Sequence, residues 1–229
     1  MMDYYEPPVA VSHFEQLIFT SDREVNIKQV ALSYMQQLDG WCSDAKASFL
    51  INTILKNQPE VVVEIGVFGG KSLVPMAYAL KMNQKGKIYG IDPWETFHSL
   101  AYMSDESNRT YWQNIDHSEI MQKLVQKISQ FDLQNQILLI KKSSQEAEPI
   151  NSIDLLHIDG NHSEEASYLD ITKWVPLVKK GGWIILDDLN WNENGVYTQT
   201  KSIDYLNTNC TKIIESHNSI DGSWGVWMK

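Results

Sequence analysis

The chain has 229 residues, 43% of them hydrophobic and 21% charged, and a formal net charge of −10. These values fit a globular protein with one large domain, or a core domain with a cap, and they exclude a disordered chain. The acidic balance, with lysines and arginines scattered along the chain, argues against a nucleic-acid partner, because such proteins need a basic surface.

Two helices are predicted in the N-terminal part of the chain. The first covers residues 25–38, where apolar side chains recur at helical spacing. The second covers residues 43–57, with Ser43 as its N-cap and its apolar residues on one face. We therefore expect residues 1–42 to form a helical cap and residues 43–229 to form the main domain.

From residue 60 onward, predicted strands and helices alternate. The expected strands cover residues 60–65, 87–91, 136–140, 153–158 and 183–186. The expected helices cover residues 72–82, 120–131, 163–178 and, with a weaker pattern, 195–207. Two last strands, 211–215 and 224–228, are separated by a turn-rich stretch and predict an antiparallel hairpin. The alternation predicts an α/β fold with a doubly wound, mostly parallel sheet that carries helices on both faces.

Residues 93–117 interrupt this alternation. Aromatic residues occur there without a clean period, directly after a predicted strand end: Trp94, Phe97, Tyr102, Tyr111 and Trp112. A long stretch of this kind is commonly a lid over a binding site, and the alternative is a surface excursion packed by its own aromatic rings. His98 and His117 lie in the same stretch and could contact a substrate, but nothing else in the sequence selects them.

The segment from Val61 to Ser72 combines a buried strand, a glycine-rich turn and the start of a helix. Glycines allow a ligand to approach the backbone closely, and a helix N-terminus offers free N–H groups. The dinucleotide-binding motif would need a glycine where Glu64 stands, and the phosphate-binding loop would need one at Ile65, so both motifs fail. A tight turn with no ligand is the alternative interpretation.

This turn resembles the class I S-adenosylmethionine-dependent methyltransferases. Their first motif is E/D-x-G-x-x-x-G, which Glu64, Gly66 and Gly70 match. The resemblance implies that the glycines accommodate the methionine part of S-adenosylmethionine and that Glu64 anchors the turn and the amino group of this cofactor. Ser72, at the start of the following helix, is included among the expected cofactor-binding residues.

Polar residues also follow the next two predicted strands. Asp92 closes the second strand, roughly 25 residues after the glycine turn, where nucleoside-binding α/β folds place a carboxylate for the ribose hydroxyls. Initiation of a turn by Asp92 and Pro93 is the alternative. Ser144 and Gln145 follow the third strand and resemble the Ser-Gln pair that holds adenine in catechol-type methyltransferases. Without that resemblance, they are only a polar loop.

Three aspartates follow the ends of two further strands. Asp159 ends the strand 153–158, and Asp187 and Asp188 end the strand that begins at residue 183. We expect them to converge, because the carboxyl ends of parallel strands meet at one edge of the sheet. Converging carboxylates repel one another unless a cation binds, and oxygen ligands favour Mg²⁺, Ca²⁺ or Mn²⁺. Alternatively, one carboxylate caps a helix and another is solvated.

The order of motifs in this half is similar to that of metal-dependent O-methyltransferases that act on sugar hydroxyls of antibiotics, the macrocin O-methyltransferase type. It comprises Ile158–His162, a helix and turn ending in Leu177–Gly182, and the pair Asp187-Asp188. The resemblance implies that Asp159, Asp187 and Asp188 bind a metal, for which we expect Mg²⁺, and that Asp159 is part of the catalytic site.

The same resemblance implies that His162 is the general base, at a position where catechol-type enzymes have a lysine. A histidine with a pKa near neutrality can accept a proton from a hydroxyl made acidic by a metal. His162 could instead cap the helix that begins near Ser163. His157, inside a predicted strand, is interpreted as a core residue, and no other candidate residues surround His13 or His217.

The sequence therefore predicts an S-adenosylmethionine-dependent O-methyltransferase, assisted by a divalent metal, that acts on a hydroxyl of a sugar or natural product. The alternatives are a hydroxylase-type enzyme on the same fold, a non-catalytic module that binds S-adenosylmethionine and, least favoured, a nicotinamide dehydrogenase. Cys42 and Cys210 are too few for a disulfide scaffold. With no signal peptide and no apolar run of about 20 residues, we expect a cytoplasmic protein without a membrane partner, which could form a homo-oligomer.

Overall fold

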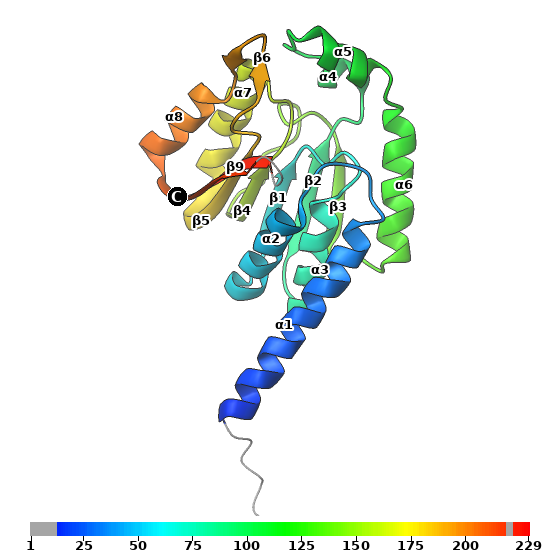
Figure 1. Ribbon diagram of the computed structural model, residues 1–229, viewed down its shortest axis with the longest axis vertical. Helices are drawn as coiled ribbons and strands as arrows, with labels where there is room; N and C mark the ends of the chain where they lie inside the picture. The colour runs from blue at the N-terminus through cyan, green and yellow to red at the C-terminus, as the bar shows by residue number, and fades with distance from the viewer. Residues whose placement is uncertain (1–12, 219–221) are drawn as a thin grey trace, which may run out of the picture.

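The computed structural model describes residues 13–218 and 222–229. Its centre is a seven-stranded sheet with the strand order β3-β2-β1-β4-β5-β9-β8 (Figure 1). The sheet strands are β1 (Val61–Ile65), β2 (Lys87–Asp92), β3 (Ile137–Lys141), β4 (Ile153–Ile158), β5 (Val178–Asp187), β8 (Thr211–Asn218) and β9 (Gly222–Met228). The first five run parallel, and β9 runs antiparallel to both β5 and β8. The predicted mostly parallel sheet with a C-terminal hairpin is confirmed.

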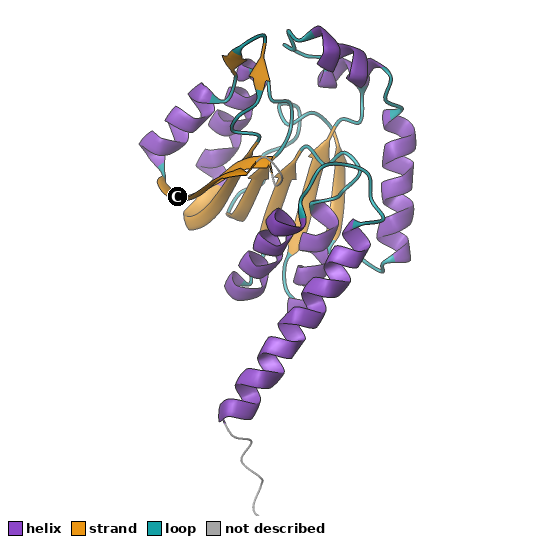
Figure 2. Ribbon diagram, in the orientation of Figure 1, coloured by secondary structure: helices purple, strands orange, loops and turns teal. Residues whose placement is uncertain are grey.

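Helices cover both faces of the sheet, as Figure 2 shows. They are α1 (His13–Met35), α2 (Asp44–Asn57), α3 (Leu73–Asn83), α4 (Thr96–Ser99), α5 (Glu106–Gln113), α6 (His117–Gln130), α7 (Glu164–Trp174) and α8 (Thr200–Asn209). One hydrophobic core lies under α1, α2, α3 and α6, and a second lies under α7 and α8. Strands β1 and β4 are buried between these cores, which explains why both read as nearly continuous apolar runs. No helix within the described residues is long and apolar enough to span a bilayer.

Two helix boundaries differ from the prediction for local reasons. The helix predicted over 163–178 ends at Trp174, continues as a 3-10 turn (Val175–Leu177) and passes into β5 at Val178. Pro176 stops the α-helix because it has no backbone N–H to continue the ladder of hydrogen bonds, although Val175 before it still has helical φ and ψ angles of −59° and −40°. The helix predicted from residue 195 begins at Thr200, because residues 192–197 form the small hairpin of β6 (Asn192–Glu193) and β7 (Val196–Tyr197).

The N-terminal helix and the aromatic stretch are also organised differently from the prediction. Helix α1 begins at His13 rather than Val25, and its first turns extend away from the sheet (Figure 1). Residues 93–117 contain the short helices α4 and α5 and end at the start of α6. Ser43 caps α2 as predicted: its side-chain oxygen accepts the N–H of Lys46 at 3.1 Å. Residues 1–12 of the proposed cap and residues 219–221 of the predicted turn lie outside the described residues.

Candidate active site

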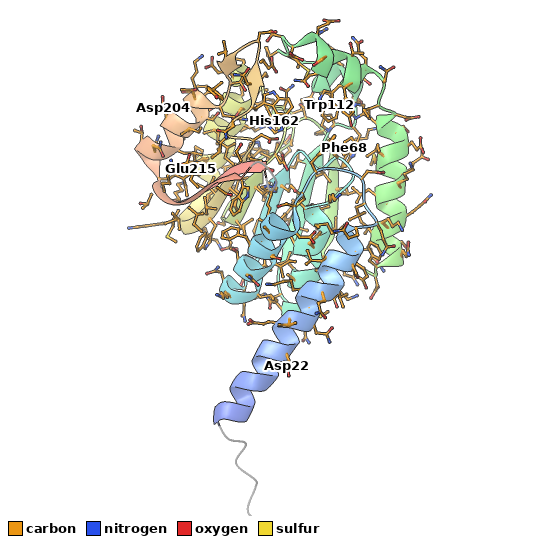
Figure 3. All side chains as sticks on the ribbon, viewed as in Figure 1. Asp22, Phe68, Trp112, His162, Asp204 and Glu215 are labelled. Atoms are coloured by element: carbon orange, nitrogen blue, oxygen red, sulfur yellow. The ribbon has the colours of Figure 1, made fainter. Side chains whose placement is uncertain are left out.

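A cavity of about 1290 Å³ lies at the carboxyl edge of the parallel strands. Its walls come from the turn after β1, the end of β2, the loop after β3, the ends of β4 and β5, and residues 97–112 of the aromatic stretch. Phe68, Trp112 and His162, all labelled in Figure 3, lie at this end of the sheet although they are far apart in the sequence. A cavity of this size can bury a nucleoside cofactor and a second small molecule together.

The glycine turn after β1 is held against the end of β4. Gly66 has a φ of 82°, which disfavours any residue with a side chain. A Cβ atom at Gly66 would lie 2.1 Å from the carbonyl oxygen of Asp159. The backbone of Asp159 also donates a hydrogen bond to the carbonyl of Ile65, at 2.8 Å. Gly66 therefore allows the glycine turn and the turn after β4 to pack directly on each other.

Replacing Gly66 with alanine is expected to lower the free energy of unfolding by about 3 kcal/mol, because a left-handed backbone costs about 1–2 kcal/mol and the new methyl group overlaps the backbone of Asp159. Urea denaturation measures this loss. Gly181→Ala is the matched control: Gly181 has a φ of 79°, and its Cβ would meet no atom within 4 Å. It should lose only about 1 kcal/mol. Equal losses in the two variants would contradict the packing argument.

Glu64 lies beneath the glycine turn rather than on the cavity wall. Its carboxyl group is fully buried: the Ser72 hydroxyl donates to Oε1, and Nδ1 of His157 is hydrogen-bonded to the same oxygen at 2.9 Å. Burial raises the pKa of Glu64 to about 8. Glu64 therefore anchors the turn through Ser72, whereas a direct contact with the cofactor's amino group stays a prediction. Gly70 is also set back from the cavity, and a Cβ there would overlap Leu124 of α6 at 2.5 Å.

Asp92 lines the cavity, but its carboxylate also supports the glycine turn. Oδ2 accepts the backbone N–H groups of Val67 at 3.0 Å and Phe68 at 2.9 Å. Oδ1 accepts the N–H of Trp94 at 2.7 Å. Burial raises the pKa of Asp92 despite these hydrogen bonds. The oxygen Oδ1 has a second lone pair, which can accept a hydrogen bond from a ligand hydroxyl such as that of the predicted ribose.

The three predicted carboxylates converge at the cavity, together with a residue that the sequence analysis missed. Nζ of Lys46 lies 3.1 Å from Oδ2 of Asp159 and also forms an ion pair with Asp187. Lys46 is only 2% exposed, because the first turn of α2 packs against the strand ends. Burial alone would lower the pKa of Lys46, but the surrounding acidic groups, Asp159 first among them, together outweigh burial and raise this pKa.

Asp188 belongs to a second pair within the same cluster. Its Oδ2 lies 2.9 Å from Nε2 of His162, which is 3.9 Å from Oδ1 of Asp159. Burial opposes the charged form of His162, but Asp188 outweighs it and raises the pKa of His162. Burial likewise opposes ionisation of Asp188, and His162 outweighs it and lowers the pKa of Asp188. His162 thus faces the carboxylates, while Ser163 occupies the N-cap position of α7.

His157 is buried, as expected for a core residue, but it is not a fully satisfied one. Nδ1 bonds to Glu64, and Nε2 has no hydrogen-bond partner among the residues that the structure describes. This nitrogen lies 3.9 Å from Asp159 and 3.9 Å from Asp187. Burial lowers the pKa of His157 to about 3, so the ring is neutral. His157 therefore links Glu64, the residue beneath the glycine turn, to the carboxylate cluster.

Aromatic rings from three segments line the mouth of the cavity. Trp41 stacks on Phe68 with ring centroids 5.3 Å apart, and Trp112 packs edge-on against Phe68 at 5.7 Å. His117 stacks on Trp112 at 6.0 Å, and burial lowers its pKa. The aromatic stretch therefore borders the cavity, as expected for a segment next to a binding site. Its closure over a substrate stays a prediction.

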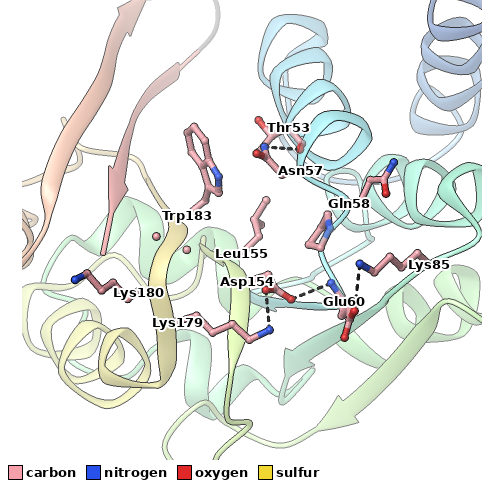
Figure 4. A pocket seen from close by; sticks show the side chains of 13 residues that line it. Thr53, Asn57, Gln58, Glu60, Lys85, Asp154, Leu155, Lys179, Lys180 and Trp183 are labelled. Carbon is pink, nitrogen blue, oxygen red and sulfur yellow. Dashed lines mark hydrogen bonds and ion pairs between the residues drawn. The ribbon is translucent and has the colours of Figure 1, made fainter. Parts of the chain in front are cut away.

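A second, smaller hollow of about 340 Å³ lies at the opposite edge of the sheet (Figure 4). Four of its charged side chains bind one another: Lys179 pairs with Asp154 at 2.9 Å and Lys85 pairs with Glu60 at 3.1 Å. Asp154 also accepts the backbone N–H of Glu60 at 2.9 Å. These four charges are already paired, so the larger cavity, with its converging carboxylates, is the candidate active site.

The strand order and the cavity above its glycine turn define the fold of class I S-adenosylmethionine-dependent methyltransferases. A family model described as a methyltransferase domain matches residues 63–189, and the chain belongs to this family. This match covers β1 through β5, including the glycine turn and the first residues after β5.

Similar structures include O-methyltransferases with bound cofactor or product. TomG of Streptomyces achromogenes, solved with S-adenosylmethionine, is 14% identical with a TM-score of 0.60, and the match covers 88% of each chain. The O-methyltransferase of Bacillus cereus, solved with S-adenosylhomocysteine, is 16% identical with a TM-score of 0.58, over 90% of each chain. NovP is 18% identical with a TM-score of 0.58, over 90% of this chain and 79% of its own. At these identities, the likeness establishes the fold.

A curated relative, the uncharacterized protein R132 of Acanthamoeba polyphaga mimivirus, is 32% identical over 139 residues. The match covers 61% of this chain and 55% of that protein, so the chain spans about half the length of this relative.

Proposed function

We propose that the chain transfers a methyl group from S-adenosylmethionine to a hydroxyl of a small molecule such as a sugar or natural product. One observation carries this proposal. The glycine turn and the cluster of Asp159, His162 and Asp188 open into the same cavity. The cofactor supplies a methyl group that is already activated on a sulfonium, so the protein's main contribution is to position the acceptor.

Residues around the glycine turn fit the proposed cofactor. Gly66 and Phe68 bring the backbone to the cavity wall, and Oδ1 of Asp92 retains an acceptor site. Ser144 and Gln145 offer a hydroxyl and an amide at the same edge. With Glu64 and Ser72 supporting the turn from below, these residues would hold the cofactor across the strand ends.

His162 is the proposed general base, acting through Nε2. This nitrogen faces Asp159 and Asp188, where an acceptor hydroxyl held by the cluster would lie. In the structure Nε2 lies 2.9 Å from Asp188, so the acceptor hydroxyl would have to replace this contact before Nε2 can take its proton, and the negative charges of Asp188 and Asp159 beside the ring would then stabilise the imidazolium. The aromatic rings at the cavity mouth, including Trp41 and Trp112, would exclude water from this transfer.

The donor set also fits a hard divalent cation. Ligand atoms of Asp159, His162 and Asp188 lie within 4.8 Å of one another, and so do those of His157, Asp159 and Asp187. With His162 neutral, three carboxylates and the ammonium of Lys46 leave two net negative charges, which a divalent ion balances. When bound, such an ion lowers the pKa of a coordinated hydroxyl. Asp159, Asp187 and Asp188 are kept as its proposed ligands: each of the two groups contains two of these aspartates and shares Asp159, while Lys46 now bridges Asp159 and Asp187.

The test of this function is incubation with labelled S-adenosylmethionine and a panel of sugars, catechols and polyketide alcohols, followed by mass spectrometry. Methyl transfer adds the mass of one CH₂ group to the acceptor, whereas a hydroxylase would add one oxygen atom. Binding of S-adenosylhomocysteine, measured by calorimetry, tests the cofactor separately. No binding would refute the proposal. Binding without turnover of any acceptor, together with full biological activity of an Asp187→Asn/Asp188→Asn variant, would favour a non-catalytic module.

Removing the metal gives a separate prediction. Because the metal is proposed to acidify the acceptor hydroxyl, EDTA treatment should lower turnover at least about tenfold, and added Mg²⁺ or Mn²⁺ should restore it. Binding of S-adenosylhomocysteine should remain unchanged, since the proposed cofactor residues are distinct from the three aspartates. Turnover that is indifferent to both EDTA and added metal would contradict the metal assignment while leaving methyl transfer intact.

The proposed division into a cap of residues 1–42 and a methyltransferase domain of residues 43–229, with a lid at 93–117, is kept as part of this proposal. Lys46 and Ser43 support a boundary near residue 43, because α2 already contributes to the carboxylate cluster.

A further inference from the structure

The loop after β3, residues 143–147, is held along its length by one face of α7. Nζ of Lys173 donates to the backbone carbonyls of Ser144, Gln145 and Ala147 at 2.8, 2.7 and 2.9 Å. The indole N–H of Trp174 donates to the carbonyl of Ser144 at 3.2 Å. Helix α7 therefore sets the position of this loop's backbone before any ligand binds.

Asp170, one turn earlier on α7, sets the side chains of the same loop. Its Oδ1 accepts hydrogen bonds from the hydroxyl of Ser144 and from Nε2 of Gln145, the latter at 3.0 Å. Asp170 is only 4% exposed, and burial raises its pKa to about 6, so the side chain is mostly ionised at neutral pH. Removing a carboxylate from water is energetically costly. Packing alone therefore does not account for a buried aspartate at this position.

An ionised carboxylate can only accept hydrogen bonds, which fixes the orientation of the Gln145 amide. The NH₂ group of Gln145 must point to Asp170, and this leaves Oε1 as the atom available to a ligand. Gln145 lines the cavity, and because Asp170 binds its NH₂ group, Oε1 is the amide atom left for a ligand there. The hydroxyl of Ser144 is likewise committed as a donor to Asp170 and can only accept from a ligand.

We propose that Asp170 is a positioning residue that makes this loop selective for a purine with a 6-amino group, through the fixed Oε1 of Gln145. This inference rests on the proposed function, in which Ser144 and Gln145 hold the adenine of the cofactor. A 6-amino group can donate to Oε1. A 6-oxo group would place two acceptors against each other, which costs the hydrogen bond and leaves both groups unpaired.

The experiment compares S-adenosylhomocysteine with S-inosylhomocysteine, its 6-oxo analogue, by calorimetry. The wild-type protein should bind the adenosyl compound at least about tenfold more tightly, the effect of one lost hydrogen bond. Asp170→Asn keeps the size of the side chain but can donate as well as accept, so Gln145 can turn over, and this ratio should fall about fivefold. Asp170→Ala should remove the discrimination.

Gln145→Ala provides the reference for a loop that cannot discriminate between the two bases. The ratio of the Kd values for the two ligands should be the same in Gln145→Ala as in Asp170→Ala. In the double variant this ratio should fall no further, because both changes remove the same interaction. Lys173→Met is the control for a structural effect: it frees the loop carbonyls and should weaken both ligands by the same factor. An unchanged ratio in the folded Asp170 variants, or losses that add in the double variant, would overturn the inference. Failure of the wild-type protein to bind S-adenosylhomocysteine at all would instead overturn the proposed function.

Discussion

Replacing Lys46 with methionine is expected to lower the free energy of unfolding by about 4 kcal/mol, the loss typical of breaking a buried ion pair from one side. The variant leaves Asp159 and Asp187 facing each other near the cavity floor without the ammonium that now binds both. For a protein of this size, the change corresponds to a fall in Tm of about 8–16 °C. Thermal and urea denaturation in the presence of EDTA measure it.

Lys123→Met is the matched control for this variant. Lys123 forms an ion pair with Glu119 at 2.8 Å, but its side chain is 53% exposed. Its replacement should change stability by no more than about 1 kcal/mol. Adding Asp187→Asn to Lys46→Met should recover part of the loss, because it removes one of the two facing charges. A loss below about 1 kcal/mol in Lys46→Met would contradict the role of Lys46 as their counter-ion.

The parts of the fold that could be predicted are those whose signal is local. Strands β1 and β4 read as apolar runs because helices cover both of their faces, and their ends place Glu64 and Asp159. Parallel pairing of β4 with β5 then brings Asp187 and Asp188 beside Asp159. This rule of topology needs no knowledge of side-chain contacts, so the carboxylate cluster could be located from the sequence.

The partners of these carboxylates were harder to predict from the sequence, because they depend on tertiary packing. Lys46 lies 113 residues before Asp159, and only the docking of α2 brings them together. One local signal was present: Lys46 precedes Leu50 by one helical turn and so falls on the buried face of α2. A lysine on an apolar helix face implies a buried counter-charge. The second role of Asp92, as an acceptor for the glycine turn, depends in the same way on how two loops pack.

Replacing His162 with glutamine is expected to lower kcat by about a hundredfold to ten-thousandfold, the usual contribution of a general base. Glutamine keeps a polar group beside Asp188 but cannot accept the proton of a hydroxyl at neutral pH. The Kd for S-adenosylhomocysteine should stay within about twofold, because none of the proposed cofactor contacts is changed. Initial rates, with calorimetry on the same preparation, separate the two quantities.

His98→Gln is the control, since His98 also lines the cavity but its nearest carboxylates, Glu95 and Glu146, are 4.0 Å away. It should retain most of the wild-type kcat. His162→Gln activity above a tenth of the wild-type value would show that the acceptor loses its proton to another group. An equal loss of kcat and cofactor affinity would point to a structural role for His162, whose ring also packs on Trp191 at 5.0 Å. A loss confined to kcat distinguishes a base from a packing residue, because packing on Trp191 affects bound and free enzyme alike.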